Sequence, residues 1–260
     1  MRVMLNSTQD GKGHPIVLLH GMAGSLRYWN PVIPLLSERH RVIALDLLGF
    51  GQSPKPKTDY TADNHVREIC RSLDALAVDE PVTLVGHSMG GLIALRLAVR
   101  QPERVHRLVL ISMPLYRNPE EAKAAITGGR PLLRWIYYGL SSRMLCFLWC
   151  RLLRPLSRRV APLYLRRLHR AAAEDSVLHT WRSYDSSRRN VLEEMRVEEE
   201  LAALRVPAIL LYGVMDDPVT LHNLSHLRGS SNVEVLIREG GHDLPLGQPE
   251  LVARLVTDQP

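Results

Sequence analysis

Short runs of apolar residues alternate with stretches of helical spacing along most of the chain. The runs are typical of strands buried on both faces, and they occupy residues 15–19, 41–45, 82–85, 107–111, 207–212 and 232–237. Residues 61–78 instead carry apolar side chains at a spacing of about 3.6, which predicts an amphipathic surface helix. Weaker patterns predict an edge strand within residues 1–6 and helices over residues 28–38 and 249–256. Strands that alternate with helices predict an α/β fold, a mostly parallel sheet flanked by helices.

The alternation stops after Pro114. Residues 115 to about 200 show no convincing strand pattern, only helix-like stretches over residues 131–153, 155–172 and 174–195. Strand-like runs resume at residue 207. We therefore predict one core domain made of residues 1–114 and 201–260, interrupted by a helical insertion over residues 115–200.

The sharpest local pattern is Gly86-His-Ser88-Met-Gly90, which joins a buried strand to a helix. A turn this tight strains the backbone of its central residue and leaves no room for side chains two positions to either side, where the two glycines stand. Ser88 is therefore expected at the tip, with the amide N–H of Met89 pointing at the oxygen of the group that the serine attacks. The alternative is a glycine-rich turn in which the serine has no chemical role.

Other candidate groups also follow strand ends, which share one edge of a parallel sheet. The loop His20-Gly21-Met22 can turn the Met22 N–H toward the point that Met89 faces, giving two donors for an oxyanion, or it can be a simple strand-ending turn. Asp46 is expected to accept backbone N–H bonds in its own loop, a structural role.

A serine hydroxyl needs a neighbouring base, and a neutral imidazole suits that role at pH 7. His242 follows the last predicted strand, and the preceding Gly240-Gly241 frees its loop to bring the ring over Ser88. The imidazole in turn needs a carboxylate to fix its tautomer. Asp216 and Asp217, which follow the preceding strand, are the two candidates for that carboxylate.

The composition indicates the class of protein, its location and whether it has a metal or disulfide framework. With 45% hydrophobic and 23% charged residues over 260 positions, the chain has the make-up of an ordinary globular protein. The first ten residues turn polar too early for a signal peptide and no run of 18 apolar residues occurs, so we expect a cytoplasmic location. Three cysteines without a C-x-x-C pair argue against a disulfide framework or a zinc site, and we expect neither a metal nor a cofactor.

The net charge of +6 is unevenly distributed. Residues 122–173 contain ten arginines and one lysine but no acidic residue, whereas the rest of the chain has 22 basic against 27 acidic residues. The arginines can simply extend to solvent from packed helices, which we favour. They can also lie on an anionic membrane surface, or bind an acidic partner such as an acyl carrier or a coenzyme A thioester. No motif for nucleic-acid binding accompanies the charge.

Taken together, these motifs resemble the α/β-hydrolase fold family. The resemblance covers the whole predicted sheet, with the motifs His20-Gly21, Asp46-x-x-Gly49-x-Gly51-x-Ser53, Gly86-His-Ser-Met-Gly90-Gly91, Gly213-x-x-Asp216-x-x-Val219 and Gly241-His242. It implies a Ser88–His242–Asp216 triad of the esterase or lipase type, an oxyanion hole from the Met22 and Met89 N–H groups, and a cap formed by the helical insertion. Leu48 stands where the family usually has arginine, and the shortened N-terminal hairpin leaves open whether an edge strand is missing.

The resemblance implies a hydrolase that cleaves a carboxylic ester, thioester or lactone of a moderately hydrophobic substrate through an acyl-enzyme on Ser88. Two alternatives stay open: a carbon–carbon bond hydrolase or lyase with the same triad, and a small-molecule receptor of the same fold. The motifs do not distinguish a monomer from an oligomer. The residues expected to line the substrate pocket are His20, Gly21, Trp135, Tyr138 and Leu244.

Overall fold

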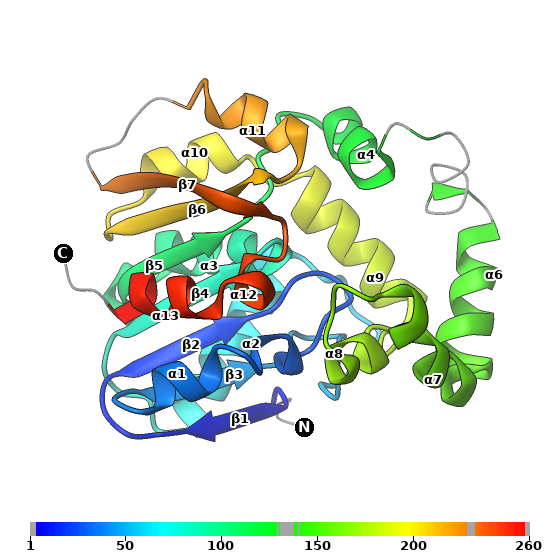
Figure 1. Cartoon of the computed structure of the whole chain (residues 1–260), viewed down its shortest axis with the longest axis horizontal. Helices are drawn as coiled ribbons and strands as arrows, with labels where there is room; N and C mark the ends of the chain where they lie inside the picture. The colour runs from blue at the N-terminus through cyan, green and yellow to red at the C-terminus, as the bar shows by residue number, and fades with distance from the viewer. Residues whose placement is uncertain (1–3, 129, 131–137, 140, 228–231, 258–260) are drawn as a thin grey trace.

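A computed structural model describes residues 4–128, 130, 138–139, 141–227 and 232–257. Its centre is a seven-stranded sheet in the order β1-β3-β2-β4-β5-β6-β7 (Figure 1). The first strand is antiparallel to its neighbour and every other pair is parallel. The strands are β1 (Ser7–Asp10), β2 (Pro15–Leu19), β3 (Arg41–Leu45), β4 (Val82–His87), β5 (Val105–Ile111), β6 (Ala208–Met215) and β7 (Val233–Gly241). The predicted α/β fold with a mostly parallel sheet is confirmed.

The inner strands are mostly apolar because helices cover both faces of the sheet. In β2, Val17 and Leu19 belong to one hydrophobic cluster, whereas Ile16 and Leu18 belong to the other, as the alternation of a strand requires. The first cluster includes side chains of α2 (Ala62–Ala75), α3 (Met89–Arg100) and α10 (Val197–Ala203). The second includes side chains of α1 (Ile33–Ser37), α12 (Leu244–Gly247) and α13 (Pro249–Thr257), which lie together on the other face in Figure 1.

Two predicted elements differ from the structure. The N-terminal edge strand is β1, at residues 7–10, and the described residues 4–6 before it are not part of a strand. The helix predicted over residues 28–38 is two short pieces, a 3-10 helix η1 (Leu26–Trp29) and α1. Pro31 lies between them, and a proline disfavours helical backbone at the residue before it and lacks an N–H of its own.

The described part of residues 115–200 is helical and contains no strand. Its elements are α4 (Pro119–Thr127), α6 (Ser141–Phe147), the π-helical η3 (Leu148–Leu152), α7 (Arg154–Tyr164), α8 (Arg170–Asp175), α9 (Trp181–Ser187) and η4 (Arg188–Glu193). Figure 1 shows α6, α7, α8 and α9 together on one side of the sheet domain, and we call residues 115–196 the cap. Helix α10 crosses the predicted boundary at residue 200 and packs against α3, so it belongs with the core.

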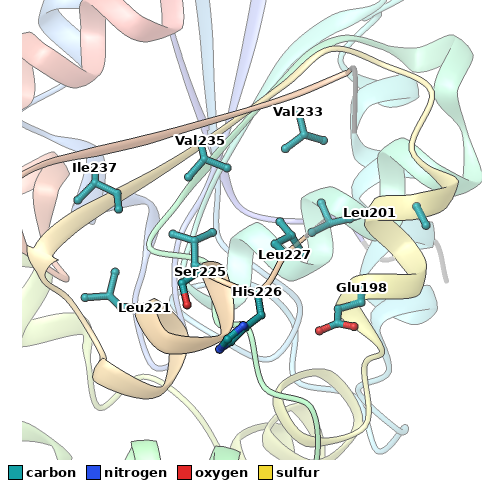
Figure 2. A pocket seen from close by; sticks show the side chains of 11 residues that line it. Glu198, Leu201, Leu221, Ser225, His226, Leu227, Val233, Val235 and Ile237 are labelled. Carbon is teal, nitrogen blue, oxygen red and sulfur yellow. The ribbon is translucent and has the colours of Figure 1, made fainter. Parts of the chain in front are cut away.

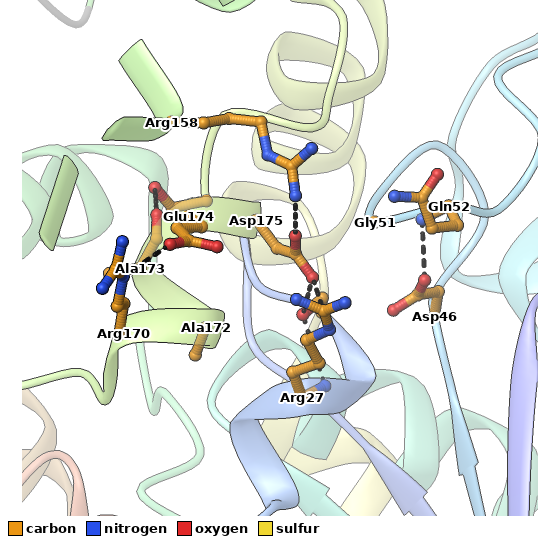
Figure 3. Close-up of polar contacts among 12 residues, drawn as sticks. Arg27, Asp46, Gly51, Gln52, Arg158, Arg170, Ala172, Ala173, Glu174 and Asp175 are labelled. Atoms are coloured by element: carbon orange, nitrogen blue, oxygen red, sulfur yellow. Dashed lines mark hydrogen bonds and ion pairs between the residues drawn. The ribbon is translucent and has the colours of Figure 1, made fainter. Parts of the chain in front are cut away.

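Asp46, at the end of β3, organises the loop that follows it. Its carboxylate is buried and accepts bonds from the Leu26 N–H at 2.6 Å, the Gln52 N–H at 2.7 Å and the Asn6 side-chain amide at 2.8 Å (Figure 3 shows the Gln52 bond). A side chain at Gly51, whose φ is +49°, would overlap this carboxylate. The predicted structural role of Asp46 is confirmed, and the carboxylate joins three segments that are distant in sequence.

Asp175, at the end of α8, is a second buried carboxylate and joins the cap to the core. It accepts a hydrogen bond from the Ser25 hydroxyl at 3.1 Å and pairs with Arg27 at 3.5 Å and with Arg158 of α7 at 3.3 Å (Figure 3). A carboxylate that is 3% exposed needs such partners, because an unpaired buried charge is strongly destabilising. The contact therefore fixes α8 against the loop and 3-10 helix that follow β2.

The outer edge of the sheet is partly apolar and open. A groove of about 450 Å³ runs between β7 and the helices α10 and α11 (Pro218–Leu224), and Figure 2 shows Val233, Val235 and Ile237 along one side of it. Val235 and Ile237 are 41% and 47% exposed. This edge lies in the core domain, on the opposite side of the molecule from α6 and α7 (Figure 1).

Among the residues that the structure describes, no helix has both the length and the apolar character needed to cross a bilayer.

We expect Asp46→Ala to lower the free energy of unfolding by about 3 kcal/mol, because three donors lose a charged acceptor and one of them, the Leu26 N–H, is buried. Urea denaturation measures the loss. Asp79→Ala is the matched control, since Asp79 is exposed, and it should change the free energy by less than about 0.5 kcal/mol. Equal effects of the two substitutions would contradict the organising role of Asp46.

Candidate active site

Ser88 lies at the sharp turn between β4 and α3, in a conformation that side chains rarely adopt. Its φ is +53° and its ψ is −122°. A Cβ at Gly90 would lie 2.5 Å from the carbonyl oxygens of Leu19 and His20, and a Cβ at Gly86 would overlap the Gly90 carbonyl. The glycines therefore let the helix start close to the ends of two strands, and the turn predicted from the sequence is confirmed.

Asp216 and His242 meet at the same edge of the sheet. Asp216 follows β6 and is 5% exposed, and His242 follows β7. The Nδ1–H of His242 donates to the Asp216 carboxylate at 2.8 Å, which leaves the Nε2 of the ring unprotonated and available as a base. Asp217 has a different role, because its carboxylate accepts the Thr220 N–H at 3.0 Å and caps α11. The geometry therefore selects Asp216 as the partner of the imidazole.

The pKa values of this pair move apart. Burial, the largest effect, lowers the pKa of His242, but the hydrogen bond and charge of Asp216 outweigh it and raise the pKa above its usual 6.5. Burial raises the pKa of Asp216, and the hydrogen bond and charge of His242 lower it by more, so that its pKa is lowered overall. The arrangement therefore stabilises an imidazolium that faces a carboxylate, as a general base requires once it has taken a proton.

Ser88 and His242 line one cleft of about 650 Å³, together with Asp216. Within the described residues, no hydrogen bond joins the Ser88 hydroxyl to the imidazole. Such contacts are often long before a substrate is bound and shorten in the reacting complex, so the separation does not disqualify the pair. The cleft brings together the three side chains proposed from the sequence, and their catalytic roles remain predictions.

Two backbone N–H groups lie where an oxyanion could form. Met89 is the first residue of α3, so its N–H has no acceptor within the helix. Met22 lies in a turn closed by the bond from the Gly24 N–H to the Gly21 carbonyl at 3.2 Å, which does not use the Met22 N–H. Met22 and Ser88 both line the cleft. The predicted pair of donors is compatible with this geometry.

His87, next to Ser88, holds the loop that carries His242. Its Nε2–H donates to the carbonyl of His242 at 2.9 Å, and its ring stacks on Tyr28 with centroids 4.5 Å apart. The Tyr28 hydroxyl in turn donates to Asp243 at 3.3 Å. Burial lowers the pKa of His87 to about 3, so the ring stays neutral and keeps this one donor. Sequence reasoning gave His87 no role, although it stands inside the recognised motif.

The predicted pocket residues separate into three groups. Gly21 lines the cleft. His20 does not: its ring is fully buried, accepts the Leu47 N–H at 3.0 Å, and so joins the loops after β2 and β3. Leu244, the first residue of α12, does not either, because it is buried in the second hydrophobic cluster. Tyr138 lies against the Arg188 guanidinium, 4.1 Å from its ring centroid, and outside the cleft lining.

Trp135 lies outside the described residues. The cleft includes residues that the sequence did not single out, chiefly Tyr28, Tyr116 and the apolar cap residues Ile126, Leu165, Leu168 and Leu192. Tyr116 follows the end of β5, just as the other candidate residues follow strand ends. This place in the sequence could have identified Tyr116 as a cleft residue.

The cap also gathers three residues that could hold a soft metal ion. The ligand atoms of Cys146, Cys150 and His179 lie within 4.8 Å of one another, with the Cys150 sulfur 3.5 Å from the His179 Nε2. The two cysteines are one helical turn apart, but the histidine comes from a different segment, so sequence spacing gave no sign of it. These side chains line a separate cavity of about 510 Å³ and not the Ser88 cleft.

Comparisons with known proteins agree with this architecture. A family model for the alpha/beta hydrolase fold matches residues 14–249. A 2-hydroxy-6-oxo-6-(2'-aminophenyl)hexa-2,4-dienoic acid hydrolase of Metapseudomonas resinovorans is 43% identical over 106 residues, 40% of this chain and 37% of that protein. A cis-3-alkyl-4-alkyloxetan-2-one decarboxylase of Shewanella oneidensis is 35% identical over 135 residues, 51% of this chain and 41% of that protein. The matches thus span about two fifths of these curated relatives.

Among solved structures, E-2-(acetamidomethylene)succinate hydrolase superposes with a TM-score of 0.74 at 20% identity. The superposition covers 98% of this chain and 94% of that chain. At this identity the likeness is one of fold.

We expect Asp216→Asn to lower kcat/KM by far more than Asp217→Asn, about a thousandfold or more, because only Asp216 holds the imidazole. The base must be neutral, so wild-type kcat/KM should fall as pH drops through a midpoint above 6.5. Asp216→Asn removes the groups that raise this pKa, so its residual activity should show a lower midpoint. The pH dependence of kcat/KM for the three proteins tests both points, and the reverse ranking would assign the role to Asp217.

We expect His87→Phe to lower kcat by roughly ten- to a hundredfold, because the ring can still stack on Tyr28 but no longer anchors the His242 carbonyl. His106→Phe is the matched control, since this exposed histidine lies on β5 and away from the cleft. Steady-state kinetics and thermal denaturation separate the two effects. A loss of stability with unchanged kcat would show that His87 serves packing alone.

Proposed function

The chain belongs to the α/β-hydrolase fold family, and we propose that it is a serine hydrolase cleaving a carboxylic ester, thioester or lactone through an acyl-enzyme on Ser88. One observation carries the proposal. The imidazole of His242 is paired with Asp216 at 2.8 Å, in the cleft that also contains the strained Ser88. A serine held this way beside an oriented base is an arrangement for nucleophilic attack on a carbonyl.

In the first half of the proposed reaction, the Ser88 oxygen bonds to the substrate carbonyl carbon while its proton passes to the Nε2 of His242. The Asp216 carboxylate stabilises the imidazolium, and the N–H groups of Met22 and Met89 bind the oxyanion. When the oxyanion collapses, the bond to the alcohol or thiol breaks and His242 returns the proton to the leaving group. The acyl group is then bonded to Ser88.

The second half uses water in place of the serine. His242 takes a proton from water, the hydroxide attacks the acyl carbon, and the same two N–H groups bind the second oxyanion. Collapse releases the carboxylic acid, and the proton returns to the Ser88 oxygen. For a lactone the alcohol and the acid stay in the same molecule, so the single product is a hydroxy acid.

The cleft lining favours a moderately hydrophobic substrate. Apolar side chains of the cap (Ile126, Leu165, Leu168 and Leu192) share the cleft with a few polar groups. The hydroxyls of Tyr28 and Tyr116 are among the latter, and burial raises the pKa of both well above 10, so they stay protonated. Such a site suits an apolar acyl chain or aromatic group with one polar, orienting end.

A second candidate is hydrolysis of a carbon–carbon bond beside a ketone. Its support is the identity to hydrolases named for dienoic acid substrates, among them the Metapseudomonas resinovorans protein. A 2-hydroxymuconate semialdehyde hydrolase of a Pseudomonas strain is a further match of this kind, at 42% identity over 113 residues. In such a reaction the group that leaves is a carbanion equivalent and must be protonated on carbon.

We expect the wild-type protein to hydrolyse p-nitrophenyl esters and to react with a fluorophosphonate probe. Ser88→Ala should abolish labelling and lower kcat/KM at least about a thousandfold, because the nucleophile is lost. Ser225→Ala, an exposed serine in the groove of Figure 2, should leave both unchanged. The release of p-nitrophenol and the mass shift of the labelled protein are the measurements.

Turnover of a vinylogous diketone is measured beside the esters. A kcat/KM for the diketone that exceeds the value for every ester, and that is also lost in Ser88→Ala, would replace the ester proposal by the carbon–carbon candidate. Labelling or turnover that persists in Ser88→Ala would contradict both.

A further inference from the structure

In the cap helices α6, η3 and α7, small residues are buried and large apolar residues are exposed, which is the reverse of an ordinary amphipathic helix. The residues that face the protein are small: Ser142, Cys150, Ser157 and Ala161 are all at most 6% exposed. The large apolar side chains are exposed, and they are Met144, Leu145, Phe147, Leu148, Leu152, Leu153, Leu156, Leu163 and Tyr164. Of these, Leu145 and Tyr164 also line the cavity beside His179. An outward apolar surface of this extent is uncommon on a protein that meets only water.

The degree of exposure is large for the biggest side chains. Met144 is 60% exposed, Leu152 63% and Leu163 68%. In α7 the contrast falls within one helix, since Leu156 is 52% exposed while its neighbour Ser157 is fully buried. Large apolar and small polar side chains therefore occupy opposite sides of this helix.

The same surface is strongly basic. Exposed arginines stand between the apolar side chains at positions 143, 151, 159, 166 and 167, and residues 122–173 contain no acid. Within the part of the chain that the structure describes, none of these five guanidinium groups makes an ion pair with a carboxylate. Arg158, by contrast, is paired with the buried Asp175. The five arginines therefore present positive charge that no described side chain neutralises.

Apolar side chains interleaved with unneutralised arginines match the boundary layer of an anionic bilayer. We infer that the outer face of α6, η3 and α7 docks on an anionic lipid surface. The leucines, Phe147 and Met144 enter the layer below the headgroups, and the arginines bind headgroup phosphates. Tyr164 adds an aromatic side chain of the kind enriched at that depth. Docking of this face does not depend on the proposed catalytic roles of Ser88, Asp216 and His242.

The position of this face relates it to the cleft. The chain that leaves α7 continues directly into Leu165 and Leu168, which line the Ser88 cleft. A membrane held against α7 would therefore lie beside the cap wall of the cleft. An apolar substrate could then pass from the lipid to the site with little exposure to water.

The groove at β7 is the natural comparison surface. It too exposes apolar side chains, Val235 and Ile237, but its described lining residues include Glu198 and no arginine (Figure 2). Among the described residues it therefore offers apolar area without arginine charge. Binding that depends on apolar area alone would therefore involve both surfaces, whereas docking on an anionic bilayer requires the cap.

The test is sedimentation of the full-length protein with two kinds of vesicle, phosphatidylcholine alone and phosphatidylcholine with roughly one third phosphatidylglycerol. We expect the protein to partition at least tenfold more strongly onto the anionic vesicles. Raising the salt concentration should reduce the preference, because salt screens the arginines. Equal partitioning onto both vesicles, or partitioning onto neither, would overturn the inference.

Two variant pairs locate the surface. Leu152→Ser with Leu163→Ser should weaken partitioning at least about tenfold, since each leucine side chain loses its transfer from water. Val235→Ser with Ile237→Ser is the matched control at the β7 groove and should have no effect. An equal loss in both pairs, or a loss only in the control pair, would overturn the assignment to the cap.

A charge pair provides a test that does not alter the apolar surface. Arg151→Gln with Arg167→Gln should weaken partitioning by roughly fivefold for each arginine removed. Arg39→Gln with Arg205→Gln, which are exposed arginines of the core, is the matched control. Circular dichroism verifies the fold of each variant. If ultracentrifugation shows that the leucine pair disrupts a dimer, and anionic vesicles do not bind the wild type, the face is a contact between copies instead.

Discussion

The backbone turn at Ser88 is the constraint on which the arrangement of the core depends. A φ of +53° at a serine is unfavourable, and it persists because the surrounding packing permits little else. Gly90 lets α3 begin against the carbonyl ends of Leu19 and His20, so the nucleophile lies directly beside the end of β2. The neighbouring loops are tied to that point by bonds between distant segments. His20 accepts the Leu47 N–H, and His87 donates to the His242 carbonyl.

The sheet could be predicted from the sequence because burial on both faces leaves a local trace. Each inner strand contains a run of consecutive apolar residues, and the candidate catalytic residues follow the ends of these runs. Strand ends alone left Asp216 and Asp217 as alternatives, and the family resemblance implied Asp216. Asp217 precedes a proline at the first position of a helix, and this capping pattern could also have separated the two. His20 could not be placed, because the N–H that it accepts belongs to Leu47, on a different loop.

The cap was the hardest part to predict, and the reason is physical. Helical periodicity shows that large apolar residues share a face, but it does not show which way that face points. In α7 the packed side consists of Ser157 and Ala161, which let the helix approach the protein closely, and the leucines are left outside. The Cys146–Cys150–His179 group has a similar explanation, since its third member joins through folding and not through spacing.

The ion pairs of Asp175 also bear on how the cap and the oxyanion loop can move. Ser25 and Arg27, which contact this carboxylate from the core, are only a few residues beyond Met22, and Arg158 contacts it from α7 (Figure 3). A displacement of α8 must either break these bonds or pull on the segment that carries an N–H of the oxyanion hole. The carboxylate of Asp175 thus ties the position of α8 to the backbone next to Met22, whose N–H is one of the two groups proposed to bind an oxyanion.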